Sequence, residues 1–212
     1  MTPRAAHAFS QPRSAHPPPL RYAVFVMEVA TTSNEADLRP RVLNAFNRHS
    51  HYEGDGLLNH SIRLFELTKL VMNAERIDFD DDVAFGIAMF HDLGLTVPRG
   101  ESPTYMHRSL TLFQEEFGGL CGAVDSTIIE ECMLLNHRVF PVPNSTPEAE
   151  AFRKAVWIEH TRGLKRYGLV DKASVRDVFR RHPRANLDRV LLDFFWITVR
   201  NEPRTITNGI LF

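Results

Sequence analysis

Cysteine is scarce in this 212-residue chain, and neither charge sign is in excess. Cys121 and Cys132 are the only cysteines, and they do not form a C-x-x-C pair, so no disulfide framework is predicted. The formal net charge is −1, with acids and bases interspersed, which argues against nucleic acid as a partner. Because no disulfide framework is predicted, we expect both cysteines to be reduced thiols and the protein to be cytoplasmic.

Long hydrophobic runs are also missing. No apolar run approaches the roughly 20 residues that span a bilayer, because Glu28 interrupts residues 22–30, and no membrane role is predicted. A glycine-rich phosphate loop of the Walker type is absent too, which excludes only that mode of phosphate recognition.

The first residues differ in composition from the rest. Five prolines and two arginines occur in residues 1–20, with few large apolar groups, so we expect residues 1–26 to be a disordered extension. Residues 27–212 are long enough for one domain with a hydrophobic core, and the apolar fraction of 43% is that of a globular protein.

Apolar residues recur at steps of three to four from residue 35 onward, which predicts a single all-α domain. Only residues 22–29 resemble a strand. We take the dense apolar stretch 191–199 as a helix that faces the core or a second subunit of a homodimer. The helices that we expect cover residues 35–48, 57–72, 80–91, 102–117, 125–137, 146–161, 175–180 and 186–199.

Histidine is abundant, with ten in the chain, and the most informative pair is His91-Asp92 at the end of an apolar helix. His60 lies one helix earlier. Two imidazoles and a carboxylate make three ligands for one divalent cation, and such a site activates water. Adjacent helical residues point about 100° apart, so His91 and Asp92 share an ion only if the backbone bends. Gly94 permits that bend.

Three further side chains are candidates for contact with a substrate. His107 and His137 lie on later helical segments, and Arg63 lies one turn beyond His60. They would position the substrate or stabilise developing negative charge, while Asp92 would also orient the metal-bound water. Structural histidines and a surface ion pair are the alternatives for these residues. If both histidines bind metal, the site holds two ions.

Two segments resemble the HD-domain superfamily of metal-dependent hydrolases: residues 59–65 (NHSIRLF) and residues 89–95 (MFHDLGL). The chain is most similar to the branch that contains cyanamide hydratase-like and uncharacterised bacterial HD proteins, over residues 55–205. The resemblance implies a helical bundle of the HD type around a metal ion. It also implies four ligands, a first histidine, a His-Asp doublet and a late aspartate, of which His60, His91 and Asp92 match three.

The late aspartate has no direct match. Residues 151–160 (AFRKAVWIEH) resemble the family segment that carries it, with Val156 at the usual ligand position. Glu159 lies three residues on, nearly on the same helix face, and we expect it to reach the ion as the fourth ligand. His160 is the other candidate.

The resemblance implies a metal-dependent hydrolase whose substrate is a small phosphorylated, nitrile-like or amide-like molecule. The residues do not select among these substrates, nor among Zn, Mn, Fe and Mg as the divalent metal ion. Two alternatives remain: a diiron oxygenase that uses His107 and His137 as extra ligands, and a non-catalytic ligand-binding module, which Val156 motivates.

Overall fold

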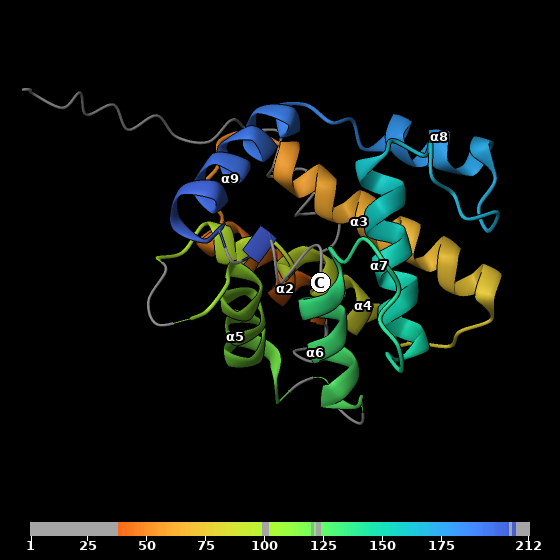
Figure 1. Cartoon of the computed structure of the whole chain (residues 1–212), viewed down its shortest axis with the longest axis horizontal. Coiled ribbons are helices and arrows are strands. Elements are labelled where there is room, and N and C mark those ends of the chain that lie inside the picture. Colours follow the sequence, from red (N-terminus) through yellow and green to blue (C-terminus); the bar gives the residue numbers. More distant parts are fainter. Residues whose placement is uncertain (1–37, 99–101, 120, 122–123, 204, 207–212) are drawn as a thin grey trace, which may run out of the picture. The chain divides into compact units, whose positions relative to one another are not determined.

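The computed structural model describes residues 38–98, 102–119, 121, 124–203 and 205–206. The proposed extension at 1–26, the strand-like residues 22–29 and the expected helix start at 35–37 lie outside this part. Within it, the chain forms eight α-helices and one 3₁₀ helix, and no residue lies in a strand (Figure 1). The prediction of an all-α fold is confirmed.

Apart from the start of α2, whose expected residues 35–37 are not described, each α-helix lies within three residues of its predicted ends, and the 3₁₀ helix η1 was not predicted. In chain order the elements are α2 (Leu38–His49), α3 (Gly56–Glu75), α4 (Asp81–Phe90), η1 (Leu93–Leu95), α5 (Tyr105–Phe117), α6 (Ser126–Leu135), α7 (Pro147–His160), α8 (Lys172–Arg181) and α9 (Leu187–Asn201).

Side-chain caps determine where several helices begin. The Asp80 carboxylate accepts the backbone N–H groups of Asp82 and Val83, and Asp125 caps α6 in the same manner. The expected start of a helix at residue 102 is wrong. Thr104 is the extended N-cap residue of α5, and its hydroxyl accepts the His107 N–H, so the helix begins three residues later.

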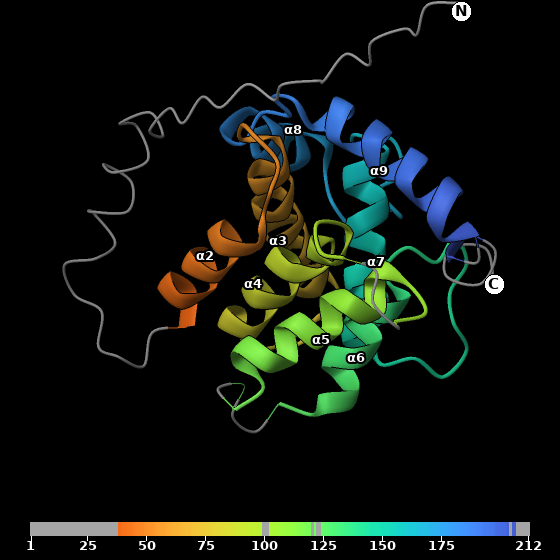
Figure 2. The ribbon, with the colours of Figure 1, turned by 90° about the vertical axis from the view of Figure 1, so that its left-hand side faces the viewer.

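The core is built around α3 and α4. All residues of α4 from 83 to 90 are buried, because α2, α3, α5 and α6 all pack against it. α3 also packs along α7, and it contacts α8 and α9 as well. In Figure 2, α9 runs away from α8 across the top of the bundle. The His-Asp pair at the end of α4 is therefore surrounded by helices.

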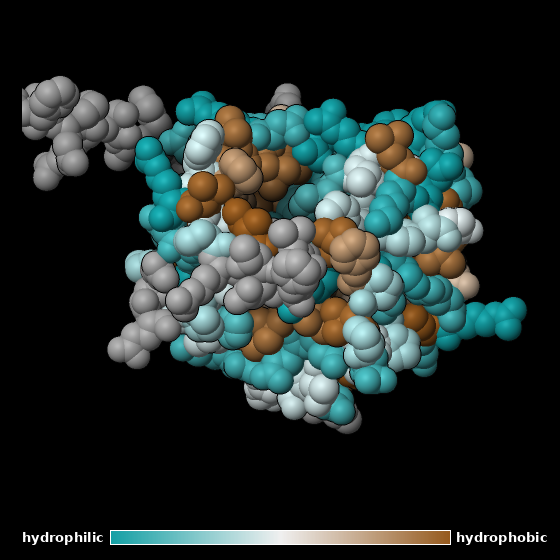
Figure 3. Space-filling model, in the orientation of Figure 1, coloured by the Kyte–Doolittle hydropathy of each residue, from teal (hydrophilic) through white to brown (hydrophobic). Residues whose placement is uncertain are grey.

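One face of α9 belongs to this core. Phe194 and Thr198 are buried, whereas Leu192, Phe195 and Trp196 are each more than half exposed. Apolar side chains accordingly gather on the surface over α9 (Figure 3). None of the described helices combines the length and hydropathy of a membrane span.

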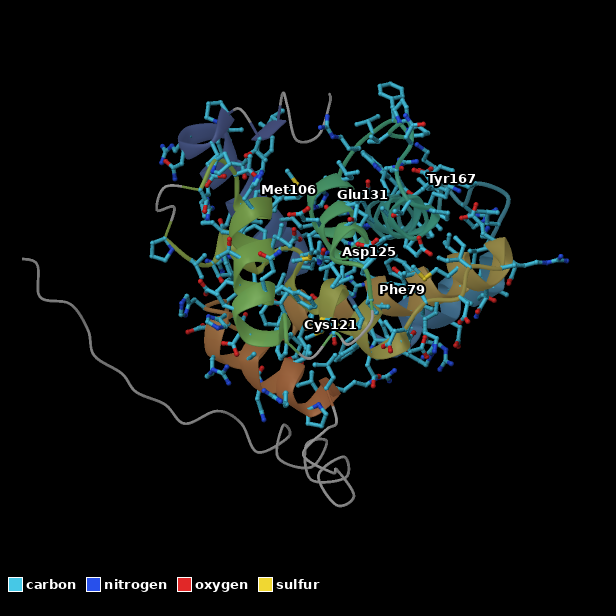
Figure 4. All side chains as sticks on the ribbon, turned by 90° about the horizontal axis from the view of Figure 1, so that it is seen from below. Phe79, Met106, Cys121, Asp125, Glu131 and Tyr167 are labelled. Carbon is cyan, nitrogen blue, oxygen red and sulfur yellow. The ribbon has the colours of Figure 1, made fainter. Side chains whose placement is uncertain are left out.

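Both cysteines are buried and free, as expected for reduced thiols. Cys121, labelled in Figure 4, donates its S–H to the Phe117 carbonyl at the end of α5. Burial raises the pKa of Cys121 and of Cys132, so both thiols stay protonated and unreactive at neutral pH.

A tight turn follows α4. The α4 helix ends at Phe90, Asp92 at φ −108° and ψ −4° precedes η1, and η1 packs closely on the first turn of α5. The Gly94 N–H donates to Ser109 Oγ at 2.8 Å, and Arg108 Nε donates to the Gly94 carbonyl at 2.8 Å. A Cβ on Gly94 would overlap the Tyr105 carbonyl oxygen and lie 2.7 Å from Ser109 N. Gly94 is thus required for close approach, whereas the bend begins at Asp92.

We expect Gly94→Ala to lower the free energy of unfolding by about 1–3 kcal/mol, because η1 and α5 must move apart to admit the methyl group. Urea unfolding followed by circular dichroism measures this change. Gly119→Ala is the matched control, since a Cβ there meets nothing within 4 Å, and a change within about 0.5 kcal/mol is expected. Equal effects of the two substitutions would contradict the close packing at Gly94.

Candidate metal centre

The structure brings His60, His91 and Asp92 together in a buried cluster. His60 comes from the middle of α3, and His91 and Asp92 follow the end of α4. The two Nε2 atoms are 3.3 Å apart, and Asp92 Oδ2 lies 3.1 Å from His91 Nε2 and 3.5 Å from His60 Nε2. One ligand atom from each residue lies within 4.8 Å of the others, so the three can hold one metal ion.

Both imidazole rings are oriented by contacts at Nδ1. His91 Nδ1 donates to the Ala88 carbonyl at 2.8 Å, which leaves the Nε2 lone pair directed at the cluster. His60 Nδ1 lies 3.1 Å from Glu159 Oε1, at an angle outside that of a hydrogen bond, so this attraction is electrostatic. Two facing Nε2 atoms repel each other unless a proton or a cation lies between them. The donor set of two imidazoles and one carboxylate suits a divalent ion.

Glu159 lies behind His60, so its expected role as the fourth ligand is corrected. Its carboxylate is fully buried on the Nδ1 side of the His60 ring, away from the two Nε2 atoms. Oε1 accepts two hydrogen bonds from Arg63, at 2.6 and 3.0 Å. This Arg63 charge draws the carboxylate away from the cluster, and Glu159 contacts His60 from outside it.

The expected contact of Arg63 with a substrate is also corrected. The side chain is fully buried, and Nη1 donates to the carbonyl oxygens of His182 at 2.8 Å and Pro183 at 3.1 Å. Arg63 thus binds the Glu159 carboxylate through Nε and Nη2 and the linker between α8 and α9 through Nη1. These hydrogen bonds fix the positions of Glu159 and of the linker.

Of the two additional histidines, only His137 reaches the cluster. His137 Nε2 lies 3.2 Å from Asp92 Oδ1, the carboxylate oxygen that does not face His60 and His91. His107 is corrected: its Nδ1 lies 2.8 Å from Thr104 Oγ1 at the start of α5, and it does not line the cavity beside Asp92. The capping contact turns its ring toward its own helix end.

A cavity of about 280 Å³ opens beside Asp92. Of His60, His91 and Asp92, only Asp92 lines this cavity. Tyr105, His137 and His160 also line it. His160 Nδ1 donates to the Val156 carbonyl at 2.9 Å, so its Nε2 carries a lone pair. Sequence reasoning missed Tyr105, because η1 brings the start of α5 to this place and no local pattern marks it.

The charges of the cluster are strongly coupled. Burial lowers the pKa of His60, but the Glu159 and Asp92 carboxylates outweigh burial and raise it to about 9. Burial opposes ionisation of Asp92, yet the surrounding imidazoles hold its pKa well below the usual range. Burial and the neighbouring His137 lower the pKa of His160 to about 4, so that ring is neutral at pH 7.

No family model matches the chain, and no curated protein or solved structure is detectably similar to it. The chemistry that the site can support therefore follows from its side chains and their geometry.

We expect zinc affinity to rise about tenfold per pH unit up to about pH 9, because the ion must displace the proton on His60. The same proton stabilises the metal-free fold. Since the folded pKa of about 9 exceeds the ordinary 6.5, that stability is complete below pH 6.5 and is lost as the pH rises to about 9. Zinc titrations and urea unfolding between pH 6 and 9.5 measure both trends. Identical profiles for His60→Gln and the wild type would contradict them.

Glu159→Gln should weaken zinc binding by about 10- to 100-fold, because the neutral amide no longer supports the His60 ring or neutralises Arg63. Competition with a chromophoric chelator gives the affinity. Glu148→Gln, in the first turn of the same helix, is the control and should leave it unchanged. If both variants bind zinc equally, Glu159 does not support the site.

Proposed function

We propose that this protein is a metal-dependent hydrolase with His60, His91 and Asp92 as the ligands of one divalent cation. The observation that carries the proposal is the convergence of two imidazole Nε2 atoms and a carboxylate oxygen beside a cavity. Catalytic metal sites keep three protein ligands and an open position, and Asp92 faces the cavity where that position would lie. The likeness to the HD-domain superfamily in residues 59–65 and 89–95 supports the same reaction class.

The proposed chemistry needs a cation together with groups that handle protons. When bound, a divalent cation supplies Lewis acidity, which lowers the pKa of water toward neutrality. Tyr105 supplies a proton donor: burial and the carboxylates of Asp92 and Glu202 raise its pKa well above 10, so the O–H can donate to a substrate oxygen. The neutral His160 supplies an acceptor at Nε2 that orients water. His137 holds the second oxygen of Asp92.

The departure from the HD pattern is confined to the late acidic position. Val156 is buried and offers no side-chain ligand, while its carbonyl orients His160. His160 thereby reaches the cavity from the helix that carries the late aspartate in the family. The proposal therefore retains the first three ligands of the pattern, and His137 and His160 line the cavity beside Asp92.

One observation favours a second candidate, the diiron oxygenase. The two oxygens of Asp92 face different imidazoles, with Oδ2 toward His60 and His91 and Oδ1 toward His137. A carboxylate with this arrangement can bridge two metal ions. His107, which the sequence suggested as a further ligand, does not contribute to such a bridge.

Protein purified without chelator should carry about one equivalent of divalent metal per chain, and His91→Ala and Asp92→Asn should each retain less than about a tenth of it. Turnover should fall to background with the metal. Elemental analysis is run beside a panel of nucleotides, phosphomonoesters, nitriles and amides. His49→Ala is the matched histidine control, because His49 pairs with Glu116 outside the cluster.

The same measurements separate the alternatives. Two equivalents of iron with substrate-dependent oxygen consumption would establish the oxygenase. No stoichiometric metal in the wild type would favour the non-catalytic module, and full turnover by His91→Ala would reject the ligand assignment.

A further inference from the structure

The cavity beside Asp92 is lined by both polar and apolar side chains. Its apolar lining residues are Leu95 from η1, Leu191, Phe194 and Phe195 from α9, and Ile206. Thr198 is the remaining lining residue. Its volume of about 280 Å³ lies just below the range of roughly 300–1,000 Å³ that holds drug-sized ligands. The space therefore suits a compact molecule with one polar end and an apolar body.

The charged side chains of the neighbourhood are engaged inside the protein. Arg63 is bound to Glu159, and Arg108 Nη2 lies 2.6 Å from Glu202 Oε1 while its Nε binds the Gly94 carbonyl. Arg184 pairs with Asp188 and lies 3.4 Å from Glu159. These guanidinium groups neutralise buried carboxylates and are not turned into the cavity, where its described lining carries no lysine or arginine.

A phosphoryl group is recognised in proteins by cationic forks or clustered N–H donors that match its two negative charges. The polar lining of this cavity offers instead the Asp92 carboxylate, the His137 and His160 imidazoles and the Tyr105 hydroxyl. The Tyr105 hydroxyl and the imidazoles suit one neutral carbonyl or nitrile group, and no lysine or arginine of the described lining matches the charge of a phosphoryl group.

We propose that the substrate is a compact, uncharged molecule whose apolar body packs against α9 and whose polar group points to Asp92 and Tyr105. This assignment rests on the proposed function and deepens it, because it selects neutral substrates over phosphorylated ones. Leu191 and Phe195 would determine which apolar body fits, and they are specificity-determining residues that take no part in holding the ion.

Benzamide and phenyl phosphate are matched probes, since both carry a phenyl ring and differ in the charge of the polar group. Binding is measured by calorimetry with zinc-loaded protein and with chelator-treated protein. We expect benzamide to bind both forms and to bind the chelator-treated form more tightly than phenyl phosphate. The zinc-loaded protein should hydrolyse benzamide and leave phenyl phosphate intact.

Phe195 and Trp196 provide a matched pair of variants. Both are aromatic, adjacent and 53% exposed, but only Phe195 lines the cavity. Phe195→Ala should weaken benzamide binding about fivefold through lost apolar contact, and Trp196→Ala should leave it unchanged. Because both are surface positions, neither variant threatens the fold.

Three results would overturn the assignment: undetectable benzamide binding, tighter binding of phenyl phosphate to the chelator-treated protein, or equal effects of the two variants. Failure of the proposed function is distinguishable. If the protein holds no zinc and hydrolyses neither probe, the hydrolase is rejected, while preferential benzamide binding that depends on Phe195 still supports a cavity for neutral ligands.

Discussion

The buried carboxylate of Asp92 is the constraint on which the site depends. A charge withdrawn from water is destabilising unless other groups compensate it, and here three imidazoles do so from three different segments of the chain. His60 is fixed in turn by the buried pair of Glu159 and Arg63. The cluster therefore holds α3, the end of α4 and the residues after α6 together even before any ion is considered.

The fold delivers these groups through ordinary packing. α4 is apolar on every side, so it lies at the centre, and the pair that follows it is enclosed from the outset. Gly94 then lets η1 sit directly on α5, which brings Tyr105 to the cavity beside Asp92. His91 and Asp92 reach the interior because they directly follow α4, whose residues 83–90 are all buried.

Much of this could be predicted from the sequence. Periodicity gave the helices, Asp125 and Thr146 marked two of their starts, and the His91-Asp92 pair with His60 identified the cluster. Spacing along one helix could not show the direction in which the Glu159 carboxylate points, because Arg63 on another helix decides it. Tyr105 depends likewise on a contact between segments distant in sequence.

The separation between α9 and the cluster of His60, His91 and Asp92 has a consequence for how such a protein can change. α9 forms much of the cavity wall but contributes none of the clustered donor atoms, which come from α3 and the turn after α4. Substitutions along α9 can therefore reshape the space without disturbing the charged centre. In the proposed hydrolase, selectivity and reactivity are therefore encoded in separable parts of the chain, so each can drift in evolution, or be redesigned, while the other is conserved.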